Sequence, residues 1–314
     1  MSVLPVEPAY RLAERADEHR WLVTGLWSEQ AVGIVGGEPK CGKSFLALDL
    51  AVSVASGAPC LRRFVVPKAG RVLLYAAEDA LHIVRRRLDG IAIAAGMMLA
   101  NLDIQVITAP VLRLDLEVDR CNLAETVDRL RPHLLILDPF VRLHRIDENA
   151  SGEVAPLLAY LRELQRRCGV AVLVVHHARK SGASVRAGQA LRGSSEFHAW
   201  GDSNLYLRRN GDEIGLSVEH RAAPSPKPLT IELAQRGDAL ALEVADRGEP
   251  VTPAPSSLDE RITAILASAD QPIPFAELRS QVRVRAATLL ERIGALCADS
   301  RIVKTNSGYR LAST

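Results

Sequence analysis

The sequence has 314 residues, of which 48% are hydrophobic, and this length allows one large core and a smaller second domain. Its 39 Lys and Arg against 37 Asp and Glu give a formal net charge of +2, so any basic surface must be local. The five cysteines form no CxxC pair, and no segment has the roughly 18 consecutive apolar residues of a membrane helix. These features argue against a disulfide framework, a zinc site and a membrane partner, and they predict a cytoplasmic protein.

Residues 1–20 are polar and alanine-rich, with a helical pattern that suits docking onto a neighbouring subunit. Beyond them, short runs of β-branched residues and leucine alternate with longer helical patterns. The apolar runs are 31–35, 71–77, 102–107, 134–138 and 170–176, and the helical patterns are 44–56, 82–91, 121–131 and 152–167. Apolar strands separated by helices indicate a parallel sheet covered on both faces, so we predict an α/β domain over 21–248.

The pattern changes after His177. Four short apolar runs follow, at 204–209, 213–221, 228–235 and 239–245. The turn signals between them, such as Asn210-Gly211, predict antiparallel hairpins that extend the sheet. Residues 249–257 form a Pro- and Ser-rich linker. In 258–314 three helical patterns precede two short strands, which predicts a separate winged helix-turn-helix domain.

A glycine-containing loop between the first strand and the first helix predicts a nucleotide site for ATP and Mg²⁺. The backbone N–H groups of such a loop face phosphates, Lys43 supplies a charge to the β and γ phosphates, and Ser44 offers a hydroxyl to Mg²⁺. The residues predicted to bind the nucleotide are Gly37, Glu38, Pro39, Lys40, Cys41, Gly42, Lys43, Ser44 and Phe45. Cys41 lies near a helix N-terminus and Lys43, which would lower the pKa of its thiol; the alternative is a small residue that simply fits.

Three side chains at strand ends are candidates for the chemistry, because ligands bind at the carboxyl edge of parallel strands. Asp138 follows the strand 134–138 and would hold Mg²⁺, the alternative being a cap of the next turn. Glu78 would orient the attacking water or take its proton, the alternative being an acidic helix start, and Asp79 resembles a helix cap. His177 would sense the γ phosphate, although a strand-end histidine without a role fits equally well.

Two basic features extend the hypothesis. The glycine-rich stretch after Ala178 has four basic residues and no acidic one, which suits binding of phosphodiester backbone, or else a solvated loop. These are Arg179, Lys180, Arg186 and Arg192. Arg221 lies at the end of a late strand and would stabilise transition-state charge across a subunit boundary, in which case the protein is an oligomer; a surface arginine without a role is the alternative.

These segments resemble the RecA-like ATPases of the plasmid RepA helicase type, related to DnaB, RadA and KaiC. The resemblance rests on residues 21–51, 73–88, 134–153, 172–182 and 190–197, which include GGEPKCGKS, YAAEDA and VVHHARKSG. It implies a RecA-like fold, a catalytic Glu78, a sensing His177 and a hexameric ring with single-stranded DNA in its channel. The late segment VEHRAAPSPKP is similar to the family's K-x-R-x-G-P pattern, which makes Arg221 a finger acting in trans and puts Glu219 where a lysine is usual.

The carboxyl-terminal domain is not explained by this resemblance. Arg283, Arg285 and Lys304 suit a DNA groove, while the nearly balancing acidic residues suit a protein-docking wing. We therefore expect an ATP-hydrolysing ring that acts on DNA as a replicative-type helicase or translocase of a plasmid or mobile element. The alternatives are an ATP-switched regulator whose last domain binds duplex DNA or a protein, and a clock-like or defence-associated ATPase acting on proteins.

Overall fold

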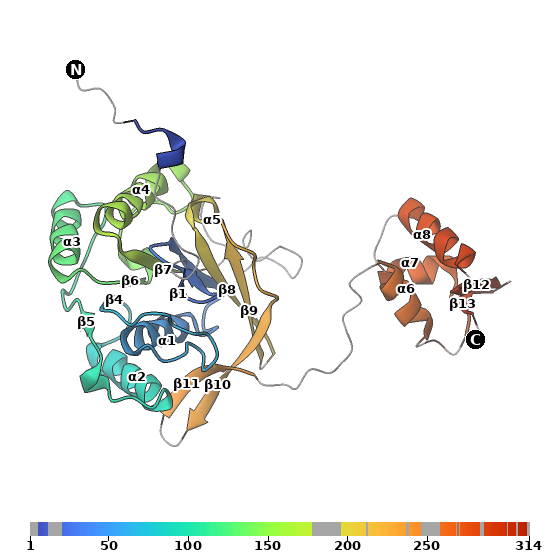
Figure 1. Ribbon diagram of the computed structural model, residues 1–314, viewed down its shortest axis with the longest axis horizontal. Helices are drawn as coiled ribbons and strands as arrows, with labels where there is room; N and C mark the ends of the chain where they lie inside the picture. The colour runs from blue at the N-terminus through green and yellow to red at the C-terminus, as the bar shows by residue number, and fades with distance from the viewer. Residues whose placement is uncertain are drawn as a thin grey trace. The chain divides into compact units, whose positions relative to one another are not determined.

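The computed structural model describes residues 6–11, 21–177, 196–211, 213–236, 239–245, 258–267, 269, 271–282, 286–299, 301–305 and 307–312 (Figure 1). The described residues form two compact units, the first ending at Ala245 and the second lying within 258–312. The predicted linker 249–257 lies outside the described residues. Among the described residues, no helix combines the length and apolar character needed to cross a membrane.

The first unit combines a large sheet with helices on both of its faces. Its strands are β1 (Trp21–Val23), β2 (Trp27–Ser28), β3 (Val32–Gly37), β4 (Val72–Ala76), β5 (Ile104–Val106), β6 (Leu134–Asp138), β7 (Ala171–His177), β8 (Ser203–Asn210), β9 (Glu213–His220), β10 (Leu229–Arg236) and β11 (Ala239–Val244). Its helices are η1 (Ala9–Arg11), α1 (Lys43–Ser56), α2 (Leu81–Ala94), η3 (Leu99–Asn101), α3 (Glu117–Leu130), η4 (Phe140–Arg142), α4 (Ser151–Cys168) and α5 (Glu196–Trp200).

Nine strands form the main sheet, in the order β11-β10-β9-β8-β3-β7-β6-β4-β5. Strands β3 to β8 pair in parallel, and β8 to β11 pair as antiparallel neighbours. This confirms the predicted α/β fold with a parallel centre and an antiparallel extension. The short β1–β2 hairpin was not predicted, because two or three residues per strand are too few for a recognisable alternation.

Both faces of the sheet are buried, which explains why its strands are apolar throughout. On β3, Val35 joins the core beneath α1 and α2, while Ile34 joins the core beneath α3 and α4. The same alternation assigns Leu74 to the first core and Leu73 to the second. Figure 1 shows these two pairs of helices on opposite sides of the strands. Each fully buried leucine contributes about 2 kcal/mol of transfer free energy. The two cores therefore stabilise β3 and α1, the elements on either side of the predicted nucleotide loop.

Glycine ends the helix that begins at the nucleotide loop. Gly57 adopts a left-handed conformation with φ 77°, and its N–H donates to the carbonyl of Ser53 at 2.8 Å. This satisfies one of the carbonyls that a helix end otherwise leaves without a partner. Gly57 therefore ends helix α1 after Ser56, and the first turn of the helix contains Lys43 and Ser44.

The second unit contains three helices and a hairpin. These are α6 (Leu258–Ala267), α7 (Phe275–Val282), α8 (Ala286–Ala298), β12 (Ile302–Thr305) and β13 (Gly308–Leu311). Leu278, Leu289 and Leu296 are among the residues of its own core, and Ile273 forms a bridge with Tyr309 of β13. The elements lie in the predicted order, while the interpretation as a winged helix-turn-helix stays a prediction.

Candidate functional site

The loop between β3 and α1 has the backbone geometry of a phosphate-binding loop. Lys40 and Gly42 adopt left-handed conformations, with φ 63° and 90°, which turns the chain sharply before α1. Lys43 as a residue is only 5% exposed, and its ammonium group donates to the carbonyl of Glu38 at 2.6 Å. Burial lowers the pKa of Lys43, and the negative charges of Asp138 and Glu78 oppose this shift. Lys43 is therefore a buried cation placed at the helix N-terminus, where phosphate groups bind.

Gly37 is required where the end of β3 passes close to β8. A Cβ atom at this position would lie 2.4 Å from the carbonyl oxygen of Leu207 and 2.8 Å from the Sγ of Cys41. Real Cβ atoms do not approach backbone oxygens so closely, so a side chain at residue 37 would push the two strands apart. The glycine thus has a packing reason in addition to any role toward phosphate.

Asp138 and Ser44 provide an oxygen pair suited to Mg²⁺. Asp138 is the last residue of β6, is 7% exposed and shares a hydrogen bond with the Ser44 side chain. Burial is the main cause that raises the pKa of Asp138 to about 6, and the charges of Glu78 and Asp79 add to it. Mg²⁺ usually takes one or two protein oxygens and completes its shell with phosphate and water, so a hydroxyl and a carboxylate in this position fit the ion.

Glu78 and Asp79 follow β4 and reach this pair of oxygens, because Ala76 lies directly beside Asp138 in the sheet. Glu78 contacts Arg142 of η4, with 3.4 Å between its Oε1 and the Nε of the arginine. Asp79 forms an ion pair with Arg87 of α2, whose guanidinium lies 5.2 Å from the ring centroid of Phe45.

The prediction that Asp79 caps α2 is wrong. Ala80 occupies the N-cap position of the helix, and no side chain there forms a capping hydrogen bond. Asp79 instead reaches Arg87, eight residues further along the chain, because about two turns of helix bring that side chain back over the strand end.

His177 is placed differently from its neighbour His176. In the parallel pairing of β3 and β7, His177 lies beside Gly37, and its side chain lines the same cavity as Lys43. The ring of His176 faces the other core, where it stacks on Phe197 with 4.1 Å between ring centroids. The alternation of strand residues separates the two imidazoles, so only His177 is placed to meet a bound phosphate.

A cavity of about 440 Å³ brings these groups together. It is lined by Lys40, Gly42, Lys43, Ser44, Phe45, Glu78, Asp79, Arg87, Asp138, Val175, His177, Arg209, Ile214, Leu233 and Leu242. The sequence-based prediction missed Arg87 and Arg209. Arg87 lies in the run HIVRRRL at helical spacing from Asp79, and Arg209 lies near the end of β8, whose parallel pairing with β3 was not foreseen.

The hypothesis of an activated thiol at Cys41 is wrong. The side chain is completely buried, and this burial raises the pKa of the thiol, an effect that the nearby charge of Lys43 only partly opposes. The predicted influence of the helix N-terminus is therefore outweighed by desolvation, and the alternative of a small residue that fits the loop holds.

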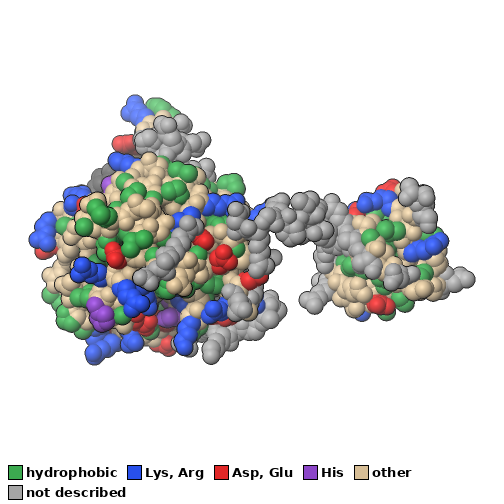
Figure 2. Space-filling view, turned by 90° about the horizontal axis from the view of Figure 1, so that it is seen from below, with side chains coloured by type: hydrophobic (Ala, Val, Ile, Leu, Met, Phe, Trp, Pro, Cys, Tyr) green, Lys and Arg blue, Asp and Glu red, His purple; other side chains and the backbone are tan. Residues whose placement is uncertain are grey.

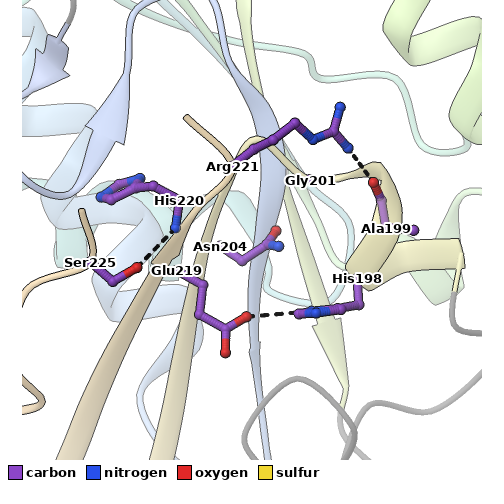
Figure 3. Close-up of a pocket in the computed structure, with 8 residues that line it drawn as sticks. All are labelled: His198, Ala199, Gly201, Asn204, Glu219, His220, Arg221 and Ser225. Atoms are coloured by element: carbon purple, nitrogen blue, oxygen red, sulfur yellow. Dashed lines mark hydrogen bonds and ion pairs between the residues drawn. The ribbon is translucent and has the colours of Figure 1, made fainter. Parts of the chain in front are cut away.

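Arg221 lies at the opposite edge of the sheet, in a second cavity of about 450 Å³ (Figure 3). One of its nitrogens lies 3.2 Å from Asp202, and another donates to the carbonyl of Ala199. His220 pairs with Ser203, the first residue of β8, whereas Gly37 pairs with Leu207, four residues further on. Four strand residues span about 13 Å, so the arginine does not reach its own nucleotide loop.

Glu219 lies beside Arg221 in this second cavity and contacts His198 of α5, with 3.4 Å between its Oε2 and Nδ1. Figure 3 shows the side chains of Glu219 and His198 directed toward each other. Glu219, which stands where the family resemblance has a lysine, therefore has a partner in its own subunit. That partner, His198, is cationic when it is protonated.

Arg179, Lys180, Arg186, Arg192, Arg283 and Arg285 lie outside the described residues. Lys304 is exposed on β12 of the second unit. On the face of the first unit drawn in Figure 2, basic and acidic side chains are interspersed, in keeping with the small net charge.

The mixed sheet with a parallel centre, together with the loop that opens α1, defines the chain as a P-loop NTPase with a RecA-like fold. Residues 3–183, more than half of the chain, match the family described as AAA domain, and the protein belongs to this family. The fold is similar to that of a solved structure described as an ATPase domain, with a TM-score of 0.56 and 14% identity over 72% of this chain and 93% of that chain.

A second solved structure shares the fold. It is described as a DnaB-like replicative helicase and its interactions with primase. The TM-score is 0.54, with 13% identity over 68% of this chain and 57% of that chain. At such low identity the two similarities establish the fold of the first unit only. What the unit binds must be argued from the residues of the site.

Proposed function

We propose that the protein is an ATP-hydrolysing ring that acts on DNA, as a replicative-type helicase or single-strand translocase of the plasmid RepA kind. The observation that carries this proposal is the cavity in which Lys43, Ser44, Asp138, Glu78 and His177 come together. The fold shared with the solved ATPase domain supports hydrolysis, and the fold shared with a DnaB-like replicative helicase supports an action on DNA.

In this proposal the residues of the cavity divide the work of hydrolysis. Lys43 and the backbone of the loop hold the phosphates, while Ser44 and Asp138 hold Mg²⁺, which neutralises charge on the β and γ phosphates when bound. Glu78 accepts a proton from water as the water oxygen bonds to the γ phosphorus. The bond from that phosphorus to the β–γ bridging oxygen breaks, which yields ADP and phosphate.

Arg221 supplies the missing charge from a second copy of the chain. It is held at the edge opposite its own loop, and 52% of its side chain is exposed. An arginine contributed in trans can raise turnover by about 10³- to 10⁵-fold, because it stabilises charge that develops on the γ phosphate. Each active site then needs two subunits, which supports a closed homo-oligomer such as a hexamer, acting in the cytoplasm.

The first test is the steady-state ATPase rate with and without single-stranded DNA, at low and moderate salt, with Lys43→Ala as the blank. Stimulation by single strands that weakens as salt rises supports the motor, because phosphate contacts release counterions. A rate that does not respond to single strands contradicts it.

A second candidate is an ATP-switched regulator whose second unit binds duplex DNA. Exposed basic side chains on its hairpin, Lys304 and Arg310, favour it. In that case hydrolysis is slow and indifferent to single strands, and binding of duplex DNA depends on base sequence. A filter-binding assay with short duplexes of differing sequence separates the two candidates.

A further inference from the structure

Two neighbouring acidic residues, Glu78 and Asp79, are held by arginines in different ways. The pair of Asp79 with Arg87 is sheltered, with 34% and 29% of the side chains exposed, and the aromatic ring of Phe45 supports its guanidinium. The pair of Glu78 with Arg142 is longer, at 3.4 Å, and its side chains are 45% and 61% exposed. The first pair is therefore part of the cavity wall, while the second is easily broken.

The backbone that carries Arg142 is firmly anchored. Its neighbours Phe140 and Leu143 are fully buried, and His144 is 7% exposed. The ring of Phe140 packs edge-on against Phe197, with 5.1 Å between centroids. Because these anchors fix the turn on both sides, a change at residue 142 is a change of the long side chain and not of the loop.

Arg142 approaches Glu78 from outside the nucleotide cavity. Among the described residues Glu78 lines that cavity and Arg142 does not. The guanidinium belongs to a side chain that is 61% exposed, so it is accessible to an anion in the solvent. Arg145, three residues further along, is also exposed, so this short segment presents two cations outward.

We propose that Arg142 is a positioning residue that restrains Glu78, and that the phosphodiester backbone of single-stranded DNA releases it by taking the guanidinium. The proposal rests on the catalytic role of Glu78 given above. While Oε1 faces Arg142, the carboxylate is drawn toward the arginine and part of its negative charge is balanced, which weakens it as an acceptor for the proton of the attacking water. When a phosphate of the DNA binds Arg142, both carboxylate oxygens become available, which links DNA binding to turnover through one side chain.

The size of the effect follows from the exposure of the pair. An exposed ion pair is worth about 0.2–1 kcal/mol, which corresponds to about 1.4- to 5-fold in a rate. Arg142→Ala should therefore raise kcat without DNA by about 1.4- to 5-fold and leave the KM for ATP unchanged. The ratio of kcat with oligothymidylate to kcat without it should fall by the same factor, because the variant's rate without DNA is already raised.

The experiment compares kcat and KM of the full chain and of Arg142→Ala, Arg142→Lys and Arg145→Ala, each with and without oligothymidylate. Arg142→Lys retains a cation beside Glu78 and should restore most of the restraint, and Arg145→Ala is the matched control, with an unchanged rate in the absence of DNA. A rise in kcat cannot result from misfolding. An unchanged or lowered kcat without DNA in Arg142→Ala overturns the restraint.

Two further variants separate this inference from the proposed function. If Glu78→Gln alone hydrolyses ATP at the normal rate, the catalytic role of Glu78 fails and the restraint fails with it. If Glu78→Gln is slow, the double variant with Arg142→Ala should be equally slow, since Arg142 acts through Glu78. A double variant that is accelerated over Glu78→Gln shows that Arg142 acts elsewhere, and the proposal is then wrong although the function stands.

Discussion

The main sheet has charged groups at both ends of its parallel strands, the nucleotide edge at their carboxyl ends and the opposite edge at their amino ends. The two edges differ in how completely these groups are buried. At the nucleotide edge Lys43 and Asp138 are 5% and 7% exposed, and each contacts other groups of the same subunit. At the opposite edge Arg221, Glu219 and His198 are each at least 40% exposed. The first edge encloses the groups that we propose to bind phosphate and Mg²⁺. The second holds charges that a partner would have to cover, which is what a group acting across a subunit boundary requires.

Removing the charge at the exposed edge should have the larger effect. We expect Arg221→Ala to lower kcat by about 10³-fold, because the variant loses the cation proposed to stabilise the charge that develops on the γ phosphate. The measurement is the ATPase rate of the pure variant and of mixtures with Lys43→Ala, since each inactive chain supplies what the other lacks. Arg129→Ala, an exposed arginine on α3, is the control and should be neutral. Mixtures that remain inactive would count against action in trans.

Changing the carboxylate at the enclosed edge should have a somewhat smaller effect. We expect Glu78→Gln to lower kcat by about 10²-fold while the affinity for ATP is retained, because the amide keeps the shape but cannot take a proton. Nucleotide binding by calorimetry and single-turnover hydrolysis separate the two properties. Glu125→Gln on α3 is a matched control. Loss of binding together with turnover would instead show a structural role for Glu78.

Strand β3 connects the two edges, and each end of it requires glycine. A Cβ at Gly33 would lie 1.7 Å from the carbonyl oxygen of Ser203, and one at Gly37 would lie 2.4 Å from that of Leu207. We expect each alanine variant to lose about 1–3 kcal/mol of unfolding free energy, with a fall in Tm of about 2–4 °C per kcal/mol. Gly152→Ala on α4, which meets open space, should keep its Tm. Equal Tm values for all three would contradict the packing argument.

The smallest effect is expected in the second unit. Lys304→Ala removes one exposed cation of the β12–β13 hairpin and should reduce the salt dependence of duplex binding by about one unit of slope, with an unchanged ATPase rate. Binding measured by fluorescence anisotropy over a series of salt concentrations tests this. An unchanged slope, with Glu291→Gln as the control for a neutral surface change, would favour a protein-docking role for the hairpin.

Local sequence was sufficient for the nucleotide loop and the fold class. The loop is predictable because glycine, lysine and serine at fixed spacing between a strand and a helix satisfy one local geometry. Asp138 and Glu78 follow from the rule that the ends of parallel strands meet at one edge, and the structure does bring them together. The alternation of His176 and His177 is likewise a local property of a strand, although which of the two faces the nucleotide needs the sheet.

Only the tertiary structure decided the groups whose partners lie far away in the chain. The pairing of β8 with β3 places Arg209 at the nucleotide cavity and Arg221 at the opposite edge, and no local pattern encodes that register. Burial also reversed the expected effect on the Cys41 thiol, because desolvation depends on the surrounding chain. The contact of Arg142 with Glu78 joins residues 64 positions apart. The local sequence therefore determines the predicted nucleotide loop, and tertiary packing determines which charged side chains lie close together.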